Sequence, residues 1–262
     1  MQRVSTITCW ADASSMHTSA RARLRLDPSS GYRLGAMPGY SCSRPLAFAV
    51  RAGQHARHVI GKGCTVYAMS LSSWAAPNAE RLLSPVGARW DHVRQVAEQA
   101  RRIAGIVPPA DRDLLVAAAY LHDVGYASEL AKTGFHPLDG ARWIRDYGPG
   151  GRLARLVAHH SCALYEARVR GLAETLLSEF EPEESPTYDA LVFCDLTTGP
   201  TGEIKSFDGR INDIYERYGP DHEVSRALNM SHAVLAACHA RVLALLESTT
   251  GQPMYGSSRF SR

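Results

Sequence analysis

Residues 117–126, "AAAYLHDVGY", place a histidine and an aspartate side by side at the end of an apolar run. The residues before them, "LLVAAAYL" (114–121), are apolar enough to be buried, so His122 and Asp123 directly follow a core segment. A buried carboxylate is costly to remove from water unless it is paired, protonated or bound to a metal. The stretch therefore predicts either a surface turn after a core helix or a polar pair directed at a ligand.

Helical periodicity extends on both sides of this stretch, over residues 84–248. In "WDHVRQVAEQARRIAGI" (90–106), Val93, Val96 and Ala100 belong to one apolar stripe with the spacing of an α-helix. Similar patterns occur at 111–124, where Asp111 is suited to cap the helix, and at 136–148, 151–161, 207–219 and 221–247. Because no alternating strand pattern of useful length appears, we predict an all-α bundle.

The first part of the chain differs in composition. Residues 1–68 contain nine Lys and Arg against two acidic residues, and no apolar period persists there. We predict a basic, disordered segment over 1–83 and a frayed tail over 249–262. A transit peptide, a nucleic-acid-binding tail and a true translation start at Met69 remain alternatives for the leading segment.

Overall composition indicates an ordinary globular protein. Of the 262 residues, 45% are hydrophobic and 21% charged, and the net charge of +3 is too small to indicate nucleic-acid binding by itself. The longest apolar runs are short or interrupted by His and Arg, so no membrane span is predicted. Six cysteines without a CxxC pair argue against a zinc ribbon and predict free thiols in a reducing, cytoplasmic setting.

Histidines and aspartates recur at the helix ends and edges of the predicted bundle. Each has a simpler interpretation alone: His92 as a hydrogen-bonded core residue, His159 and His160 as a solvated helix end, and Asp195 as a helix N-cap. Together, imidazoles and buried carboxylates from several helices favour a shared cation. Such donors suit Mn, Fe, Zn, Ni or Co, with Mg possible where oxygen ligands dominate.

The ordered set His…His-Asp…Asp resembles the signature of the HD-domain superfamily of metal-dependent phosphohydrolases, over roughly residues 88–200. "YLHDVGY" is similar to the HD-[IV]-G element of the family, and "HPLDGARWI" and "VAHHS" resemble segments of its two-metal variants. Tyr126 stands where the subfamily that cleaves cyclic dinucleotides has a lysine, and its Gly-Tyr-Pro element is missing. That activity is therefore not assigned.

The resemblance implies one or two divalent metal ions per chain and a set of ligands. It implies that the first metal is bound by His92, His122, Asp123 and Asp195. It implies that the second metal is bound by His136 and His159, with Asp123 bridging the two metals. It also implies a catalytic role for His122 and Asp123, and His160 is expected to protonate the leaving oxygen. Five basic side chains are candidates to contact a phosphate, although each is expected to be a solvated surface charge: Arg142, Arg168, Arg170, Lys205 and Arg210.

We therefore expect a metal-dependent enzyme that hydrolyses a phosphomonoester or phosphodiester of a nucleotide-like compound or another small metabolite. Two alternatives stay open. The same ligand arrangement occurs in HD-type mixed-valence di-iron oxygenases, and a catalytically inactive sensor module is the third reading.

Overall fold

The computed structural model describes residues 6–8, 21–23 and 70–250 and divides into two compact units, Met1–Ser70 and Leu71–Arg262. In the first unit, β1 (Thr6–Thr8) pairs antiparallel with β2 (Arg21–Arg23). Within the segment predicted to be disordered, 1–83, residues 71–83 instead form a helix. The rest of that prediction, the transit-peptide and nucleic-acid-tail alternatives and the start at Met69 concern residues that lie largely outside the described ranges. The predicted tail also lies outside them from residue 251 onward.

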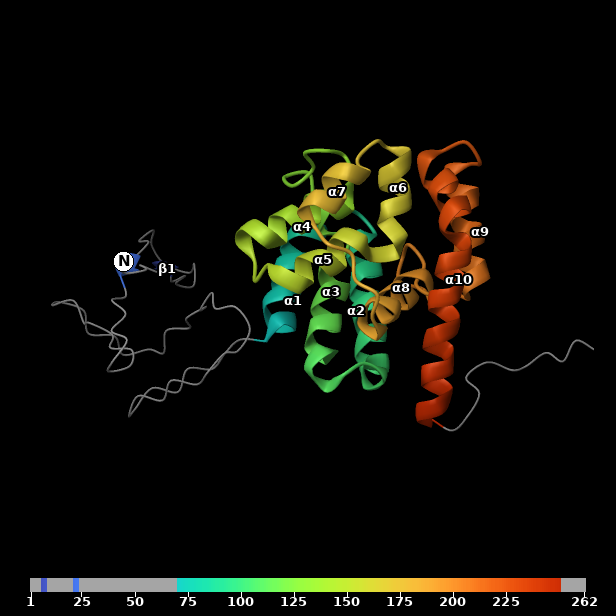
Figure 1. Cartoon of the computed structure of the whole chain (residues 1–262), viewed down its shortest axis with the longest axis horizontal. Coiled ribbons are helices and arrows are strands. Elements are labelled where there is room, and N and C mark those ends of the chain that lie inside the picture. Colours follow the sequence, from blue (N-terminus) through green and yellow to red (C-terminus); the bar gives the residue numbers. More distant parts are fainter. Residues whose placement is uncertain (1–5, 9–20, 24–69, 251–262) are drawn as a thin grey trace, which may run out of the picture. The chain divides into compact units, whose positions relative to one another are not determined.

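The described part of the second unit is all-α, as predicted (Figure 1). An isolated bridge joins Thr198 to Ile204, and 3-10 helices cover Ala104–Ile106, Pro109–Asp111, Val124–Tyr126 and His160–Cys162. The α-helices are α1 (Leu71–Leu83), α2 (Arg89–Ile103), α3 (Arg112–Leu121), α4 (His136–Tyr147), α5 (Gly151–His159), α6 (Ala163–Val169), α7 (Ala173–Glu179), α8 (Pro186–Leu196), α9 (Phe207–Tyr218) and α10 (Glu223–Thr250).

Helix α3 lies at the centre of the unit. Every residue from Leu114 to Leu121 is buried, because α1, α2, α5 and α8 all pack against it. The carboxylate of Asp111 does not cap this helix, contrary to the prediction. It accepts hydrogen bonds from Arg152 and Thr187 instead, which link it to the segments that begin α5 and α8.

The helical unit begins at Leu71 rather than at residue 84. Helix α1 buries Ala75, Ala79 and Leu82 against α3, and the carboxylate of Asp113 accepts the backbone N–H of Leu71 at 2.6 Å. Pro77 and paired serines make this segment read as non-helical in sequence. Packing against α3 overrides that weak local preference.

Two glycines allow the 3-10 helix Val124–Tyr126 to pack tightly against α4. A Cβ atom added at Gly125 would lie 2.0 Å from the carbonyl oxygen of His136. One added at Gly140 would lie 3.1 Å from the backbone nitrogen of Gly125. The two backbones approach so closely because both positions lack a side chain, and this approach brings His136 next to Asp123.

Helices α9 and α10 form one edge of the unit, beside α6 and α8 (Figure 1). Helix α10 buries Leu228, Leu235 and Val242, and Arg241 makes two hydrogen bonds of 2.7 Å to the carboxylate of Asp189 on α8. Over Glu223–Thr249 this helix is also long and apolar enough to be a candidate membrane span. One such helix is weak evidence, because core helices of soluble proteins meet the same criteria.

Candidate metal centre

Six side chains with metal-binding atoms converge inside the helical unit. They arrive from α2, from the end of α3, from the first turn of α4, from the turn after α5 and from α8. They form two groups, and in each group the ligand atoms lie within 4.8 Å of one another. The first group is His92, His122 and Asp195, and the second is Asp123, His136 and His160.

Asp123 lies between the two groups. Its Oδ2 atom is 3.5 Å from His122 Nε2 and 3.9 Å from His92 Nε2. Its Oδ1 atom is 3.3 Å from His136 Nε2 and 3.9 Å from His160 Nε2. One carboxylate oxygen thus faces each group, which is the placement that a bridging ligand needs.

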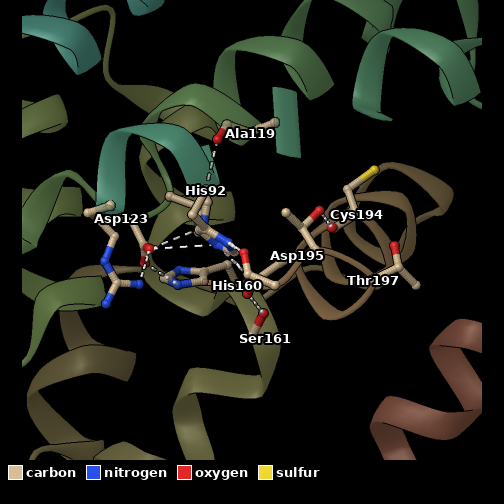
Figure 2. Close-up of polar contacts among 12 residues, drawn as sticks. His92, Ala119, Asp123, His160, Ser161, Cys194, Asp195 and Thr197 are labelled. Atoms are coloured by element: carbon tan, nitrogen blue, oxygen red, sulfur yellow. Dashed lines mark hydrogen bonds and ion pairs between the residues drawn. The ribbon is translucent and has the colours of Figure 1, made fainter. Parts of the chain in front are cut away.

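Asp195 occupies the opposite side of the first group, and Figure 2 shows the imidazoles of His92 and His160 between the two aspartates. Its Oδ1 atom is 3.1 Å from His92 Nε2, while its Oδ2 atom accepts a hydrogen bond from the hydroxyl of Ser161. Ser161 and Cys162 have positive φ angles of 47° and 59°, a conformation that favours glycine. No feature of the sequence predicted this turn, and the contact of Ser161 with Asp195 was not predicted either.

Backbone carbonyls orient three of the imidazoles. Because a carbonyl oxygen only accepts hydrogen bonds, each Nδ1 atom carries the proton and each Nε2 lone pair points to the centre. The Nδ1 partners are Gly199 for His92, Ala119 for His122 and Val157 for His160, at 2.9, 2.8 and 2.7 Å.

The residues present fit a bound cation. The Nε2 atoms of His92 and His122 are buried and have no hydrogen-bond partner among residues 70–250. The Nε2 atoms of His136 and His160 lie 3.2 Å apart, where two lone pairs repel each other unless a proton or a cation intervenes. Nitrogen and oxygen donors together suit the divalent transition metals named above, and Mg less well.

Electrostatics at the centre also favour a cation. Burial lowers the pKa of His122 and lowers that of His136 strongly, so both imidazoles are neutral ligands at neutral pH. Burial alone would raise the pKa of Asp123. The Arg89 guanidinium and the surrounding imidazoles nevertheless hold that pKa far below its usual range. The pKa of Asp195 is likewise held below its usual range against the effect of burial, by the adjacent imidazoles of His92 and His122.

Arg89 and Tyr126 support the second group. Arg89 Nη1 donates to Asp123 Oδ2 at 2.7 Å, and its guanidinium carbon lies 4.1 Å from the centre of the Tyr126 ring. The Tyr126 ring in turn stacks on His136 with a centroid distance of 4.0 Å. The Tyr126 ring therefore contacts both Arg89 and His136, and neither contact was predicted from the sequence.

His160 takes the place in the second group that was expected of His159. The structure places His160 in the second group, whereas His159 Nε2 is 2.8 Å from the carbonyl oxygen of Phe180, outside both groups. Consecutive helical residues point about 100° apart, so only one of the pair can face the centre. His160 is also no longer suited to be a separate general acid, because its Nε2 atom faces Asp123 and His136.

The centre opens into a pocket with a volume of about 120 Å³. Asp123, His136 and His160 line one wall, and α9 and α10 supply the other wall. That second wall is mixed in character: Ile214, Leu228 and Leu235 are apolar, and Arg210 and Arg217 are basic.

Residues 89–193 match the family model of the HD domain, so the resemblance predicted from the sequence is confirmed. No curated protein and no solved structure matches the chain significantly. HD domains bind divalent metals, and the family consists largely of metal-dependent hydrolases within a phosphohydrolase superfamily. Asp195, α9 and α10 lie beyond the matched segment.

The three cysteines within the described residues, Cys162, Cys194 and Cys238, are free and buried. Burial raises the pKa of each thiol. They are therefore protonated core residues rather than metal ligands at neutral pH.

Proposed function

We propose that this protein hydrolyses a phosphate ester of a small metabolite or nucleotide-like compound with the help of two divalent metal ions. The observation that carries the proposal is Asp123, whose two oxygens face separate groups of imidazoles. Two ions held by such a centre supply Lewis acidity toward phosphoryl oxygens and lower the pKa of a bound water. The chain would act in the cytoplasm and without a nucleic-acid or membrane partner.

The chain's own contribution is to build the centre before the substrate arrives. Hydrogen bonds to backbone carbonyls fix the imidazole rings of His92, His122 and His160. The Ser161 hydroxyl fixes the Oδ2 atom of Asp195 in the same way. Preorganised ligands need no rearrangement during the reaction, which is the main way an enzyme stabilises developing charge. Arg89 keeps Asp123 ionised and oriented in the same way.

The size of the pocket limits which substrates can bind. A volume of about 120 Å³ is below the ~300 Å³ at the lower end of pockets that enclose drug-sized ligands. The pocket therefore suits a phosphoryl group and a small part of its leaving group. A larger leaving group would have to extend out of the pocket.

The test combines elemental analysis with turnover. The full-length protein, purified without added metal or a chelating tag, is analysed for bound metals and then assayed with p-nitrophenyl phosphate and bis(p-nitrophenyl) phosphate. His122→Ala and Asp123→Ala are expected to lose bound metal and turnover together. The control His222→Ala changes an exposed imidazole outside both groups and should change neither.

Each other outcome has a definite meaning. Turnover that survives in both ligand variants refutes the proposal. Two iron ions per chain with substrate-dependent oxygen uptake would instead establish the di-iron oxygenase. Bound metal without turnover of any phosphate ester would favour the sensor module.

A further inference from the structure

Two nitrogens of the Arg210 guanidinium on α9 are buried without a partner among residues 70–250. Its residue is 7% exposed, and its Nε and Nη1 atoms are buried with no hydrogen-bond partner in the described part of the chain. It also forms no ion pair with any carboxylate of residues 70–250. Burying an unpaired charge is strongly unfavourable, so a protein that keeps one has a reason outside its own folding.

The other four basic side chains considered as phosphate ligands are either paired with a carboxylate or exposed. Arg142 is paired with Glu179, and Lys205 with Asp213. Arg170 is paired with Glu166 and Glu223, and Arg168 is exposed with its guanidinium over the Tyr165 ring. Arg210 therefore corrects the expectation that all five would be solvated surface charges.

Arg210 faces the metal centre across the pocket. It lines the same pocket as Asp123, His136 and His160. Arg210, Ile214 and Arg217 follow one another at i, i+4 and i+7, so they share the face of α9 that forms the pocket wall. Arg217 is exposed, whereas Arg210 is buried.

We propose that Arg210 binds the terminal phosphoryl oxygens of the substrate and selects phosphomonoesters over phosphodiesters. This inference rests on the proposed function and narrows it. A phosphomonoester dianion carries three terminal oxygens and two negative charges, whereas a diester carries two oxygens and one charge. The additional oxygen and charge are what an unpaired guanidinium opposite a metal centre can bind.

The remaining wall fits the same substrate. Leu228 and Leu235 of α10 and Ile214 of α9 give the leaving group an apolar surface. The small pocket leaves little room for the second substituent of a diester. The charge of Arg210 and the small size of the pocket therefore both favour a phosphomonoester over a phosphodiester.

The experiment compares wild type with Arg210→Met, which removes the charge and keeps most of the side-chain length, and uses inorganic phosphate as the probe. By titration calorimetry on the metal-loaded full chain, loss of a charged hydrogen bond should weaken phosphate binding about 10- to 100-fold. The ratio of kcat/KM for p-nitrophenyl phosphate to that for bis(p-nitrophenyl) phosphate should fall by a similar factor. Metal content should stay unchanged.

Thermal stability separates this role from a structural one. Because Arg210 has no partner inside the described fold, Arg210→Met should melt at the same temperature as wild type or higher when phosphate is absent. Arg226→Met, which removes an exposed arginine of α10 outside the pocket, is the matched control and should leave phosphate binding unchanged. Arg210→Gln is measured by the same criteria if the Met variant does not fold.

Unchanged phosphate affinity in the Arg210 variants overturns the inference, and so does a lower melting temperature with an unaltered monoester-to-diester ratio. If the wild type hydrolyses phosphate esters but the Arg210 variants behave like it, only this inference fails. If the wild type binds phosphate through Arg210 yet hydrolyses nothing, the proposed function fails and the anion site stands.

Discussion

Substituting Gly125 by alanine should disturb the second ligand group and spare the first. The new Cβ atom would lie 2.0 Å from the His136 carbonyl oxygen, and real contacts of this kind are essentially never below 3.0 Å. The Gly125 and His136 backbones must therefore separate by about 1.0 Å at this contact. His136 Nε2 is only 3.3 Å from Asp123 Oδ1, so a shift of that size would move the imidazole out of line with the carboxylate. A misplacement of about 1 Å in a catalytic group lowers turnover by roughly 100-fold.

The expected result for Gly125→Ala is one bound metal ion instead of two, with kcat reduced by about 100-fold. Forcing a methyl group into this packed contact should also destabilise the protein by about 1–3 kcal/mol. Elemental analysis after dialysis, turnover of p-nitrophenyl phosphate and urea unfolding measure these three effects. Gly105→Ala is the matched control, because a Cβ there meets nothing within 4 Å. Two ions and wild-type turnover in Gly125→Ala would refute the reasoning.

Three further predictions concern side chains around the centre and between helices. His160→Ala should bind one metal ion fewer and His159→Ala should not, so equal metal content in the two variants would contradict the assignment of His160. Hydrogen bonds from arginines of α4 lower the pKa of Glu179 to about 2 from 4.5, so its contribution to stability is complete above pH 4.5 and is lost as the pH falls toward 2. Glu179→Gln should therefore reduce the pH dependence of the unfolding free energy between pH 2 and 4.5. If that pH dependence is the same as in wild type, the contacts of Glu179 with these arginines do not stabilise the protein. Asp189→Asn removes the negative charge and one of the two oxygens that accept hydrogen bonds from Arg241, and it should cost about 1–3 kcal/mol by urea unfolding, while a smaller cost would mean that solvent already weakens the pair.

The sequence predicted the helices that have a clear apolar stripe. Helix α2 buries Val93, Val96 and Ala100, as its spacing indicated. Helix α1 was missed because Pro77 and two serines weaken its local pattern, and its burial depends on contacts with α3, which is distant in sequence. Local patterns report local preference, whereas tertiary packing decides marginal segments.

The candidate site was predictable where residue type and order were informative. The signal that identifies His160 rather than His159 was present in the sequence: Leu153, Leu156, Val157 and His160 continue one stripe at i, i+3, i+4 and i+7. Nothing comparable pointed to Arg210. Its importance depends on burial without a partner, which is a property of three-dimensional packing.

The division of the pocket between two parts of the chain has a further implication. Five of the six converging metal-binding residues lie within the stretch that matches the HD domain, while the second wall of the pocket comes from α9 and α10. Mutations in those two helices can alter which molecules are accepted without disturbing the reactive core. Evolution could thus retain one chemistry and redirect it to new compounds by exchanging a single C-terminal hairpin.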